Sequence, residues 1–475
     1  MRAWISLTLL LAAAMASCAP LAAEPSQSDP CIEGANQTAM PVPIRLAPLR
    51  YRCLSLHNGQ RVLVGEAGPV NARTVLLVHG LGDNAHRDWT EVVPALAMQF
   101  HVVTLDLPGF GGSPASPHGY SFTGLGEILA EVLDGTARGQ RVHMVGHSLG
   151  AALSLYFAHK HPLRVDRLVL VDAAGILLKN VFVQHMVRAQ VPKVGLAPVD
   201  RLLGALDERI KVHLGQLFDL DERIDFSQWL EQNPGIRRAL IGRHTHVEAA
   251  LSLVEHDFTV AISETTAPTT VIWGSNDPVA PLRTGKLLAG RMPDARLEVI
   301  QGVGHVPMVQ SPSAFNRLLL AGLTAPRVQT SARAVTGASQ GSVVCENRTH
   351  ARYSGVFDSI TLENCRGVQI EDARIRQVTL SSSSLSMENA VIDGADVALS
   401  VRDSEVAATN VRIRGRVAIR AERSRLDLAG VSLRASQRVV EMPAPSRMFF
   451  SVSDWHGTDH DGNAHFAWPH GAGKR

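Results

Sequence analysis

The sequence predicts an α/β unit built around a parallel sheet, followed in the same chain by an all-β unit of stacked repeats. Three observations support this fold class. The 475 residues exceed the roughly 250 to 300 residues at which a single hydrophobic core stops growing, so two units are expected. Up to about residue 325, short apolar runs alternate with helical patterns. From about residue 343, short alternating stretches recur every ~20 residues.

The composition excludes two broad classes of protein. With 45% hydrophobic residues, the chain is too apolar to be disordered. The 46 Lys and Arg residues nearly balance the 44 Asp and Glu residues, which leaves a formal net charge of +2. Because both signs are spread along the chain, no basic surface for DNA or RNA is predicted, and we expect no nucleic-acid partner.

The N-terminus has the pattern of an export signal. A short positive start is followed by an apolar run at 3–16, which is shorter than the ~20 residues that span a bilayer. Residues 1–23 are therefore interpreted as a signal peptide. Two cleavage sites remain open, one after Ala23 and one before Cys18 as in a bacterial lipoprotein. The second would attach the protein to a membrane through a lipid on Cys18. Both predict a periplasmic, outer-membrane-associated or secreted protein.

The four cysteines other than Cys18 fall into two pairs that are close in sequence. Local disulfides Cys31–Cys53 and Cys345–Cys365 are the simplest assignment in an oxidising compartment. Four unpaired buried thiols are the alternative. No CxxC spacing and no histidine partner accompany these cysteines, so no metal site is expected.

The first unit shows unbroken apolar runs, which mark strands buried on both faces of a parallel sheet whose strands are joined by helices. Between about 176 and 266 the pattern becomes helical, and we interpret this segment as a cap over the carboxyl edge of the sheet. Residues 326–342 lack periodicity, which is typical of a linker. The predicted units are therefore 40–325 and 343–475. The predicted strands lie within 74–80, 100–109, 141–148, 166–175, 269–275 and 295–305.

In the second unit, equivalent residues recur along the chain. Ser384, Ser404 and Ser424 are 20 residues apart. One apolar cycle of this length cannot bury its inner face alone, so coils must stack to form a core. Three aligned apolar sets are expected: Ile375, Ile392, Ile413 and Leu433; Ala390, Val411 and Val431; and Leu380, Leu399 and Ile419.

Residues 343–455 thereby resemble right-handed parallel β-helix proteins of the pectate-lyase-like kind. In such a stack, Cys345 and Cys365 are one period apart on adjacent coils, within the ~4.4–6.8 Å between Cα atoms that a disulfide tolerates. The His- and Asp-bearing tail from Asp454 to Trp468 is interpreted as a cap on the last coil, and a metal or sugar site is the alternative. An envelope polymer is a candidate partner for this unit.

A GxSxG motif occupies residues 146–150, between an apolar strand and a helical stretch. In that context a sharp strand-to-helix turn lifts the serine hydroxyl above the sheet. Gly146 and Gly150 are needed because side chains there would collide with neighbouring elements as the backbone reverses. Ser148 is therefore the candidate nucleophile, and a serine nucleophile needs a base and a group that orients this base.

Asp277 and His305 supply these two groups. Each follows a predicted strand, at the sheet edge where doubly wound folds place functional residues. Asp172, at the end of another predicted strand, remains an alternative acid. Upstream, the Gly-rich turn at 79–83 also follows a strand, and one of its amides can point at a developing oxyanion.

With these motifs, residues 40–325 resemble an α/β-hydrolase-fold enzyme with a helical cap. The matching motifs are, in order, HGLGD, DLPGFGGS, GHSLG, GSNDPV and GVGHVP. The resemblance implies that Ser148 is the nucleophile, His305 the general base and then acid, and Asp277 the orienting carboxylate. It also implies that the amides of Leu81 and Leu149 form the oxyanion hole, with no metal or organic cofactor.

The predicted function is an exported serine hydrolase that cleaves carboxylic esters of a small molecule, a lipid or a carbohydrate. Two alternatives stay open: a polymer-binding envelope protein with an inactive hydrolase unit, and a hydrolase that acts on C–C, amide or thioester bonds. Near the triad, Asp106 and His79 are interpreted as structural. His147 either shapes the pocket or packs, and the cap residues His244 and His246 are assigned no role.

Overall fold

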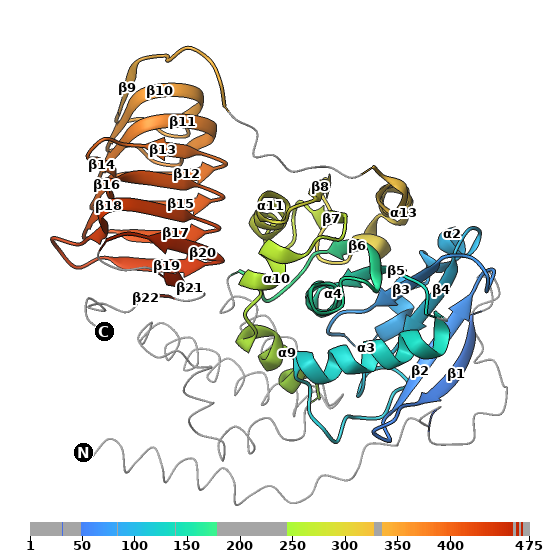
Figure 1. Cartoon of the computed structure of the whole chain (residues 1–475). Coiled ribbons are helices and arrows are strands. Elements are labelled where there is room, and N and C mark those ends of the chain that lie inside the picture. Colours follow the sequence, from blue (N-terminus) through green and yellow to red (C-terminus); the bar gives the residue numbers. More distant parts are fainter. Residues whose placement is uncertain are drawn as a thin grey trace, which may run out of the picture.

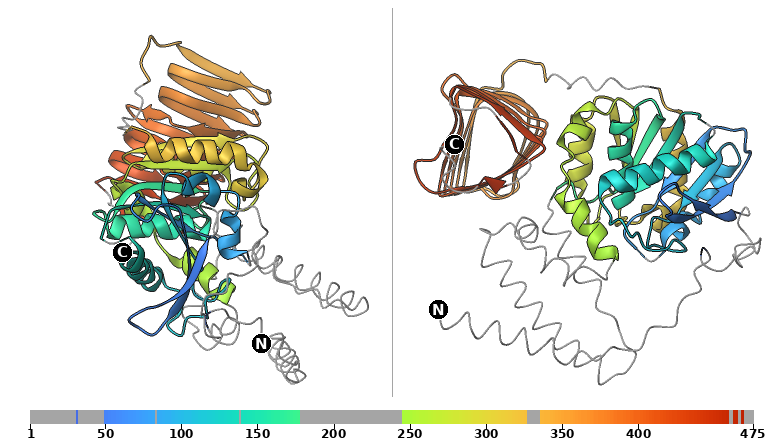
Figure 2. Two further views of the ribbon diagram at one scale, coloured as in Figure 1. Left: turned by 90° about the vertical axis from the view of Figure 1, so that its right-hand side faces the viewer. Right: turned by 60° about the horizontal axis from the view of Figure 1, so that its bottom comes forward.

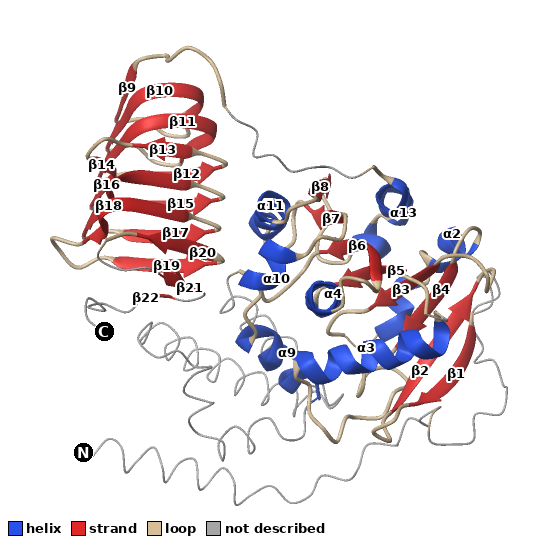
Figure 3. Ribbon diagram, in the orientation of Figure 1, coloured by secondary structure: helices blue, strands red, loops and turns tan. Residues whose placement is uncertain are grey.

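The structure is a computed structural model. It describes residues 31, 49–326 and 335–468, except 83, 138, 178–244, 459–461 and 465–466. The predicted signal peptide, Cys18 and most of the predicted cap lie outside the described residues. Figure 1 shows a mixed helix-and-strand unit followed by a stack of strands, and Figure 3 shows that the described helices all belong to the first unit. Among the described helices, none is both long and apolar enough to cross a membrane.

The first unit contains an 8-stranded sheet in the order β1-β2-β4-β3-β5-β6-β7-β8. All neighbouring strands from β4 to β8 are parallel, whereas β2 is antiparallel to both β1 and β4. The strands are β1 Arg50–Ser55, β2 Arg61–Ala67, β3 Thr74–Val78, β4 His101–Leu105, β5 Val142–His147, β6 Val165–Val171, β7 Thr269–Gly274 and β8 Ala295–Ile300. All six predicted strands are confirmed, whereas the two strands in antiparallel pairs, β1 and β2, were not predicted.

Helices cover both faces of this sheet. Along β3, Leu76 and Val78 face one core with α3, α4 and α11, whereas Val75 and Leu77 face a second core with α2 and α13. This alternation explains the unbroken apolar runs, because both faces of each central strand are buried. The helices are η1 Ala85–Trp89, α2 Val93–Ala97, α3 Phe122–Thr136, α4 Leu149–Lys160, α9 Thr245–Glu255, α10 Thr259–Glu264, α11 Leu282–Arg291, α12 Pro307–Gln310 and α13 Pro312–Thr324.

The described end of the predicted cap, α9 and α10, joins the first of these cores. Ala249 and Leu253 of α9 and Ile262 of α10 are buried in the same cluster as the residues of α4. This end of the 176–266 segment therefore belongs to the body of the unit.

The second unit is a stack of coils, which we call the solenoid (residues 342–456). Successive coils pair in parallel throughout, as in a parallel β-helix, and the right-hand view of Figure 2 shows the coils superimposed along the stack. Its strands are β9 Ser342–Glu346, β10 Arg352–Glu363, β11 Val368–Ser381, β12 Ser384–Glu388, β13 Val391–Asp393, β14 Val397–Arg402, β15 Glu405–Thr409, β16 Arg412–Glu422, β17 Arg425–Ala429, β18 Ser432–Glu441, β19 Arg447–Ser451 and β20 Ser453–His456. Two short antiparallel strands, β21 Gly462–Ala464 and β22 Ala467–Trp468, follow.

The predicted stacks are partly correct. Ile375, Ile392, Ile413 and Leu433 stand in register on four successive coils. Two other alignments were wrong by one or two residues. Leu380 pairs with Val401 instead of Leu399, and Ser383, not Ser384, stacks on Ser404 through an N–H···Oγ bond of 2.9 Å. The coils differ in length, so a fixed spacing of 20 residues loses the register.

The corners of the coils require a left-handed backbone. Asn389, Asn410 and Gly430 occupy equivalent corners with φ of 51°, 55° and 62°. Asn and Gly tolerate this conformation better than other residues do. The Asn and Gly residues at these corners therefore let these three coils turn at the same point.

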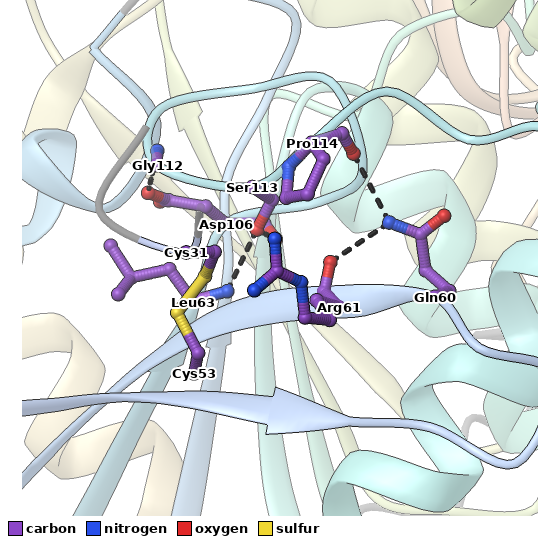
Figure 4. Close-up of a disulfide and its surroundings, with 9 residues drawn as sticks. All are labelled: Cys31, Cys53, Gln60, Arg61, Leu63, Asp106, Gly112, Ser113 and Pro114. Carbon is purple, nitrogen blue, oxygen red and sulfur yellow. Dashed lines mark hydrogen bonds between the residues drawn. A yellow bond between two sulfur atoms is a disulfide. The ribbon is translucent and has the colours of Figure 1, made fainter. Parts of the chain in front are cut away.

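The structure pairs the cysteines as the local assignment expected. Cys31 and Cys53 are bonded with their Cα atoms 5.5 Å apart, which attaches residue 31 to β1 (Figure 4). Cys345 and Cys365 are bonded at 6.5 Å between Cα atoms and join the first two coils of the solenoid.

Candidate active site

Ser148 lies on the sharp turn between β5 and α4. Its backbone has φ of 52° and ψ of −115°, a strained conformation that a non-glycine residue rarely adopts. A Cβ at Gly146 would lie 2.2 Å from the carbonyl oxygen of Gly150, and one at Gly150 would lie 2.2 Å from that of Val78. Both glycines are thus required by close backbone contacts, as the motif predicted.

His305 lies between Ser148 and Asp277. Its Nε2 is 3.0 Å from Ser148 Oγ, and its Nδ1 is 2.7 Å from Asp277 Oδ2. With the proton on Nδ1 donated to the carboxylate, Nε2 is free to accept the serine hydroxyl. The structure therefore joins three residues that are 129 and 28 positions apart in sequence into one hydrogen-bonded row. Such a row allows an imidazole to take a proton from a serine.

The loops that carry Asp277 and His305 touch each other at the carboxyl edge of the sheet. A Cβ on Gly274, the last residue of β7, would lie 2.2 Å from the carbonyl oxygen of Gly304. The second oxygen of Asp277, Oδ1, accepts backbone N–H groups of Val279 at 2.7 Å and Ala280 at 3.0 Å. Burial raises the pKa of Asp277, but the His305 hydrogen bond and charge and these two amides outweigh it, so the pKa lies below its ordinary value.

The two predicted oxyanion donors lie on segments next to Ser148. Leu149 is the first residue of α4, a position whose N–H has no acceptor within its own helix. Leu81 follows Gly80, and a Cβ on Gly80 would lie only 2.9 Å from Ser148 Cβ. The loop after β3 therefore passes directly beside the serine.

His79 holds this loop, as predicted. Its side chain is fully buried, and burial lowers its pKa, so the imidazole is neutral. The Nδ1–H donates to the Gly80 carbonyl at 2.7 Å, and Nε2 accepts the Leu107 N–H at 2.9 Å. The two bonds connect the loop after β3 to the loop after β4.

Asp106 closes the loop after β4, which also agrees with its predicted structural role. Its carboxylate accepts the N–H groups of His86 and Gly112, both at 2.9 Å. Its carbonyl accepts the Ser113 hydroxyl at 2.6 Å, and the same Ser113 oxygen accepts the N–H of Leu63 in β2 (Figure 4). This loop is therefore attached to β2.

His147 contacts the loop of His305, which sequence reasoning did not find. It precedes Ser148, and its Nε2–H donates to the backbone carbonyl of His305 at 2.7 Å. Burial, then the nearby charge of His305, lowers its pKa to about 3, so the ring stays neutral. The GxSxG motif places a residue here in sequence, but only the fold shows that it touches the His305 loop.

Asp172 is not the acid that contacts His305. It directly follows β6 with a φ of 43°, is fully buried, and its Oδ1 accepts the Gly274 N–H at 2.9 Å. Burial, and then the negative charge of Asp277, raises its pKa well above the ordinary value. The pair is thus one neutral and one ionised carboxyl group, and Asp277 is the ionised one.

The remaining candidates fall outside this row. The ring of His246 packs edge-on against Phe110, with 4.6 Å between centroids. His244 lies outside the described residues, as do three of the tail residues considered for metal binding, His460, Asp461 and His465. Within the described residues, no three His, Cys, Asp or Glu side chains are grouped so that they could hold a metal ion.

The buried, neutral state of His147 predicts how stability changes with pH. An unfolded histidine titrates near ~6.5, whereas burial holds the pKa of native His147 at about 3. Between these values the unfolded chain binds a proton that the native protein does not, so His147 lowers stability as the pH falls from about 6.5 towards 3. We expect His147→Gln to lose stability less steeply than wild type between about pH 7 and pH 5, by up to about 1.4 kcal/mol per pH unit, in urea unfolding.

His147→Leu is the matched control for this measurement. It also removes the titrating group, so its slope should equal that of His147→Gln. Only Gln keeps a donor for the His305 carbonyl, so the Leu variant should be less stable at neutral pH. Wild-type and variant curves with equal slopes would contradict a neutral His147.

Comparisons with known proteins identify the family of the first unit. Residues 73–312, just over half of the chain, match the alpha/beta hydrolase fold family. Lipase 1 of Psychrobacter immobilis is 28% identical over 275 residues, which cover 55% of this chain and 80% of the lipase. A monoacylglycerol lipase of Xenopus laevis is 26% identical over 291 residues, which cover 58% of this chain and 82% of the lipase.

Among solved structures, a hydrolase from Pseudomonas aeruginosa aligns with a TM-score of 0.44 at 24% identity, over 58% of this chain and 99% of its own. The family match extends from β3 through the Ser148, Asp277 and His305 segments to the start of α13. The chain therefore belongs to the alpha/beta hydrolase fold family.

Proposed function

We propose that the protein is an exported serine hydrolase that cleaves carboxylic esters through a covalent acyl-enzyme. One observation carries this proposal: His305 bonds Ser148 Oγ at 3.0 Å through one ring nitrogen and Asp277 at 2.7 Å through the other. A serine is a weak nucleophile until a base takes its proton, and a base works only when its ring is held in the correct tautomer.

The proposed reaction has two halves. In the first, Ser148 Oγ attacks the ester carbonyl carbon while His305 Nε2 takes the hydroxyl proton. The oxyanion that forms accepts the Leu81 and Leu149 amides, and collapse transfers the proton from His305 to the leaving alcohol. In the second half, His305 takes a proton from water, which attacks the acyl-enzyme. Collapse then releases the acid and returns the proton to Ser148.

Asp277 and Asp172 have different parts in this scheme. The lowered pKa keeps Asp277 ionised, so its carboxylate stabilises the imidazolium that forms when His305 accepts a proton. Asp172 stays protonated and adds no second negative charge beside Asp277. Its hydrogen bond to Gly274 N–H holds the end of β7, from which the Asp277 loop begins.

Two further observations support the substrate class and the export. The relatives named above are lipases, which favours a carboxylic ester over other acyl compounds. The chain carries an N-terminal pattern of a signal peptide and two disulfides, and disulfides are rare in reducing compartments. Both support a hydrolase that acts outside the cytosol.

The choice of acid can be tested with a matched pair of variants. Asp277→Asn removes the ionised partner of His305, and we expect kcat for an activated ester to fall by about 10⁴-fold. Asp172→Asn replaces a protonated carboxyl with a neutral group that can still accept the Gly274 N–H, so kcat should stay close to wild type. The reverse pattern would make Asp172 the acid and contradict the assignment of Asp277.

The nucleophile can be tested by covalent labelling. A fluorophosphonate should label the wild-type protein and leave Ser148→Ala unlabelled, because the label bonds to the activated serine oxygen. Ser154→Ala is the matched control: this serine is fully buried in α4 and should not affect labelling. Labelling of the Ser148→Ala protein at the wild-type rate would exclude Ser148 as the nucleophile.

Ester specificity needs a separate measurement. We expect turnover of chromogenic p-nitrophenyl esters, with a maximum at one acyl length in a graded series. The same series with thioester and amide leaving groups is the comparison. Turnover of thioesters or amides by a labelled enzyme that leaves every ester intact would contradict the ester assignment while leaving the nucleophile in place.

A further inference from the structure

Helix α11 contacts both units of the chain. On one side it packs against the sheet: Gly285 lies under the ring of Trp273, where a Cβ would come within 2.8 Å of a ring carbon. On the other side, Leu287 faces the solenoid, where a Cβ on Gly430 would lie 2.4 Å from its Cδ1. Figure 1 shows α11 at the side of the first unit that faces β12, β15 and β17.

The solenoid surface beneath α11 is buried although its side chains point outward. In β15 and β17, Ala408 and Leu428 point into the solenoid core, so the next residues, Thr409 and Ala429, point out. Nevertheless Thr409 is only 2% exposed and Ala429 is fully buried. Ala429 packs within the core cluster of the first unit. Burial of an outward face shows that it is covered, and α11 is the element that covers it.

Every charged residue of α11 is a cation, and each pairs with a solenoid carboxylate. Arg283 Nη1 is 2.6 Å from Asp427 Oδ2. Lys286 Nζ is 2.6 Å from Glu388 Oε2, and Arg291 Nη2 is 3.2 Å from Asp454 Oδ2. The three carboxylates come from β12, β17 and β20, so the contact extends over several coils.

Arg283 makes the most specific of these contacts. Besides Asp427, it donates to Thr409 Oγ1 at 2.7 Å and to the Ala408 carbonyl at 2.8 Å. In the opposite direction, the side-chain N–H of Asn410 in the solenoid donates to the Lys286 carbonyl at 2.8 Å. Each unit thus donates a hydrogen bond to a backbone carbonyl of the other. These directional bonds fix the position of the helix along the coils, whereas ion pairs alone would allow it to shift.

The same helix continues the loop that holds Asp277. The Asp277 carboxylate accepts the Val279 and Ala280 amides, and the Ala280 carbonyl accepts the Trp273 indole N–H at 2.8 Å. Pro281 follows as the N-cap of α11, and Arg283 lies six residues after Asp277. A displacement of α11 would therefore move the turn that orients the carboxylate.

We propose that the solenoid is docked on the hydrolase unit through the α11 contact, and that this docking positions Asp277. The coils of the solenoid bind α11, and α11 in turn holds the loop of Asp277 in the candidate active site. The docking stands on contacts alone, whereas its effect on rate rests on the proposed function. The two parts are tested separately.

Docking is tested in the full chain by a cross-link. A Cβ on Gly290 would lie 2.6 Å from Asn410 Cγ, so cysteines at both positions are within the reach of a disulfide. We expect Gly290→Cys combined with Asn410→Cys to form an intramolecular disulfide under mild oxidation, detected by mass spectrometry of linked peptides. Gly290→Cys combined with Asp403→Cys, at the exposed corner that precedes β15, is the control and should not link. Failure of the first pair to link in folded protein would overturn the docking.

Positioning is tested by charge reversal across the interface. Lys286→Glu and Glu388→Lys each place like charges together, and we expect each to reduce the fluorophosphonate labelling rate by about 2- to 30-fold. The double variant restores the pair and should recover most of the rate. Asp403→Lys is the matched control, because it reverses a solenoid carboxylate that pairs with Arg423 and not with α11. It should label at the wild-type rate.

The outcomes separate the two proposals. Cross-linking with unchanged labelling in both single variants would leave the docking intact and overturn the positioning of Asp277. Absence of labelling in wild type would contradict the proposed function, while the cross-link would still decide the docking.

Discussion

The close approach of four loops at the carboxyl edge of the sheet is the constraint on which this site depends. Glycines make it possible, because Gly80, Gly146, Gly150 and Gly274 each stand where a Cβ would overlap a neighbouring segment. Only with the backbones this close can the imidazole of His305 bond a hydroxyl on one side and a carboxylate on the other. The loop after β3 then lies beside the same serine.

Burial and hydrogen bonding at this edge also determine which side chains are charged. A carboxylate (Asp277), a protonated carboxyl (Asp172) and two neutral histidines (His79 and His147) lie at or just after the ends of four different strands at this edge, and each charge state follows from burial and hydrogen-bond partners. Asp277 stays charged because it accepts three hydrogen bonds, whereas burial and the negative charge of Asp277 raise the pKa of Asp172 and keep it protonated. His147 and His79 stay neutral, so each offers one donor in a fixed direction and no second positive charge near His305.

The solenoid is stabilised differently, because each coil pairs its backbone and packs its apolar side chains against the next coil. Its inward stacks supply the hydrophobic core, and its outward residues are normally left to solvent. The outward face under α11 is an exception, because Thr409 and Ala429 are buried there and three solenoid carboxylates pair with three cations of the helix. An outward face of a repeat domain becomes an interface when a neighbouring helix supplies complementary charge and shape.

Residue patterns alone predict the parallel strands, the two-unit organisation and the candidates Ser148, Asp277 and His305. These follow from local pattern, because buried strands are apolar without interruption and the GxSxG turn demands glycine. Residue patterns did not predict β1, a partly exposed edge strand, or β2, which is mostly buried, and they misplaced Leu380 and Ser384 where coils vary in length. Three features appear only in the folded chain: Asp277 and not Asp172 faces His305, His147 bonds the His305 loop, and α11 contacts the solenoid. Each of these depends on distances between segments far apart in the chain, which no local pattern records.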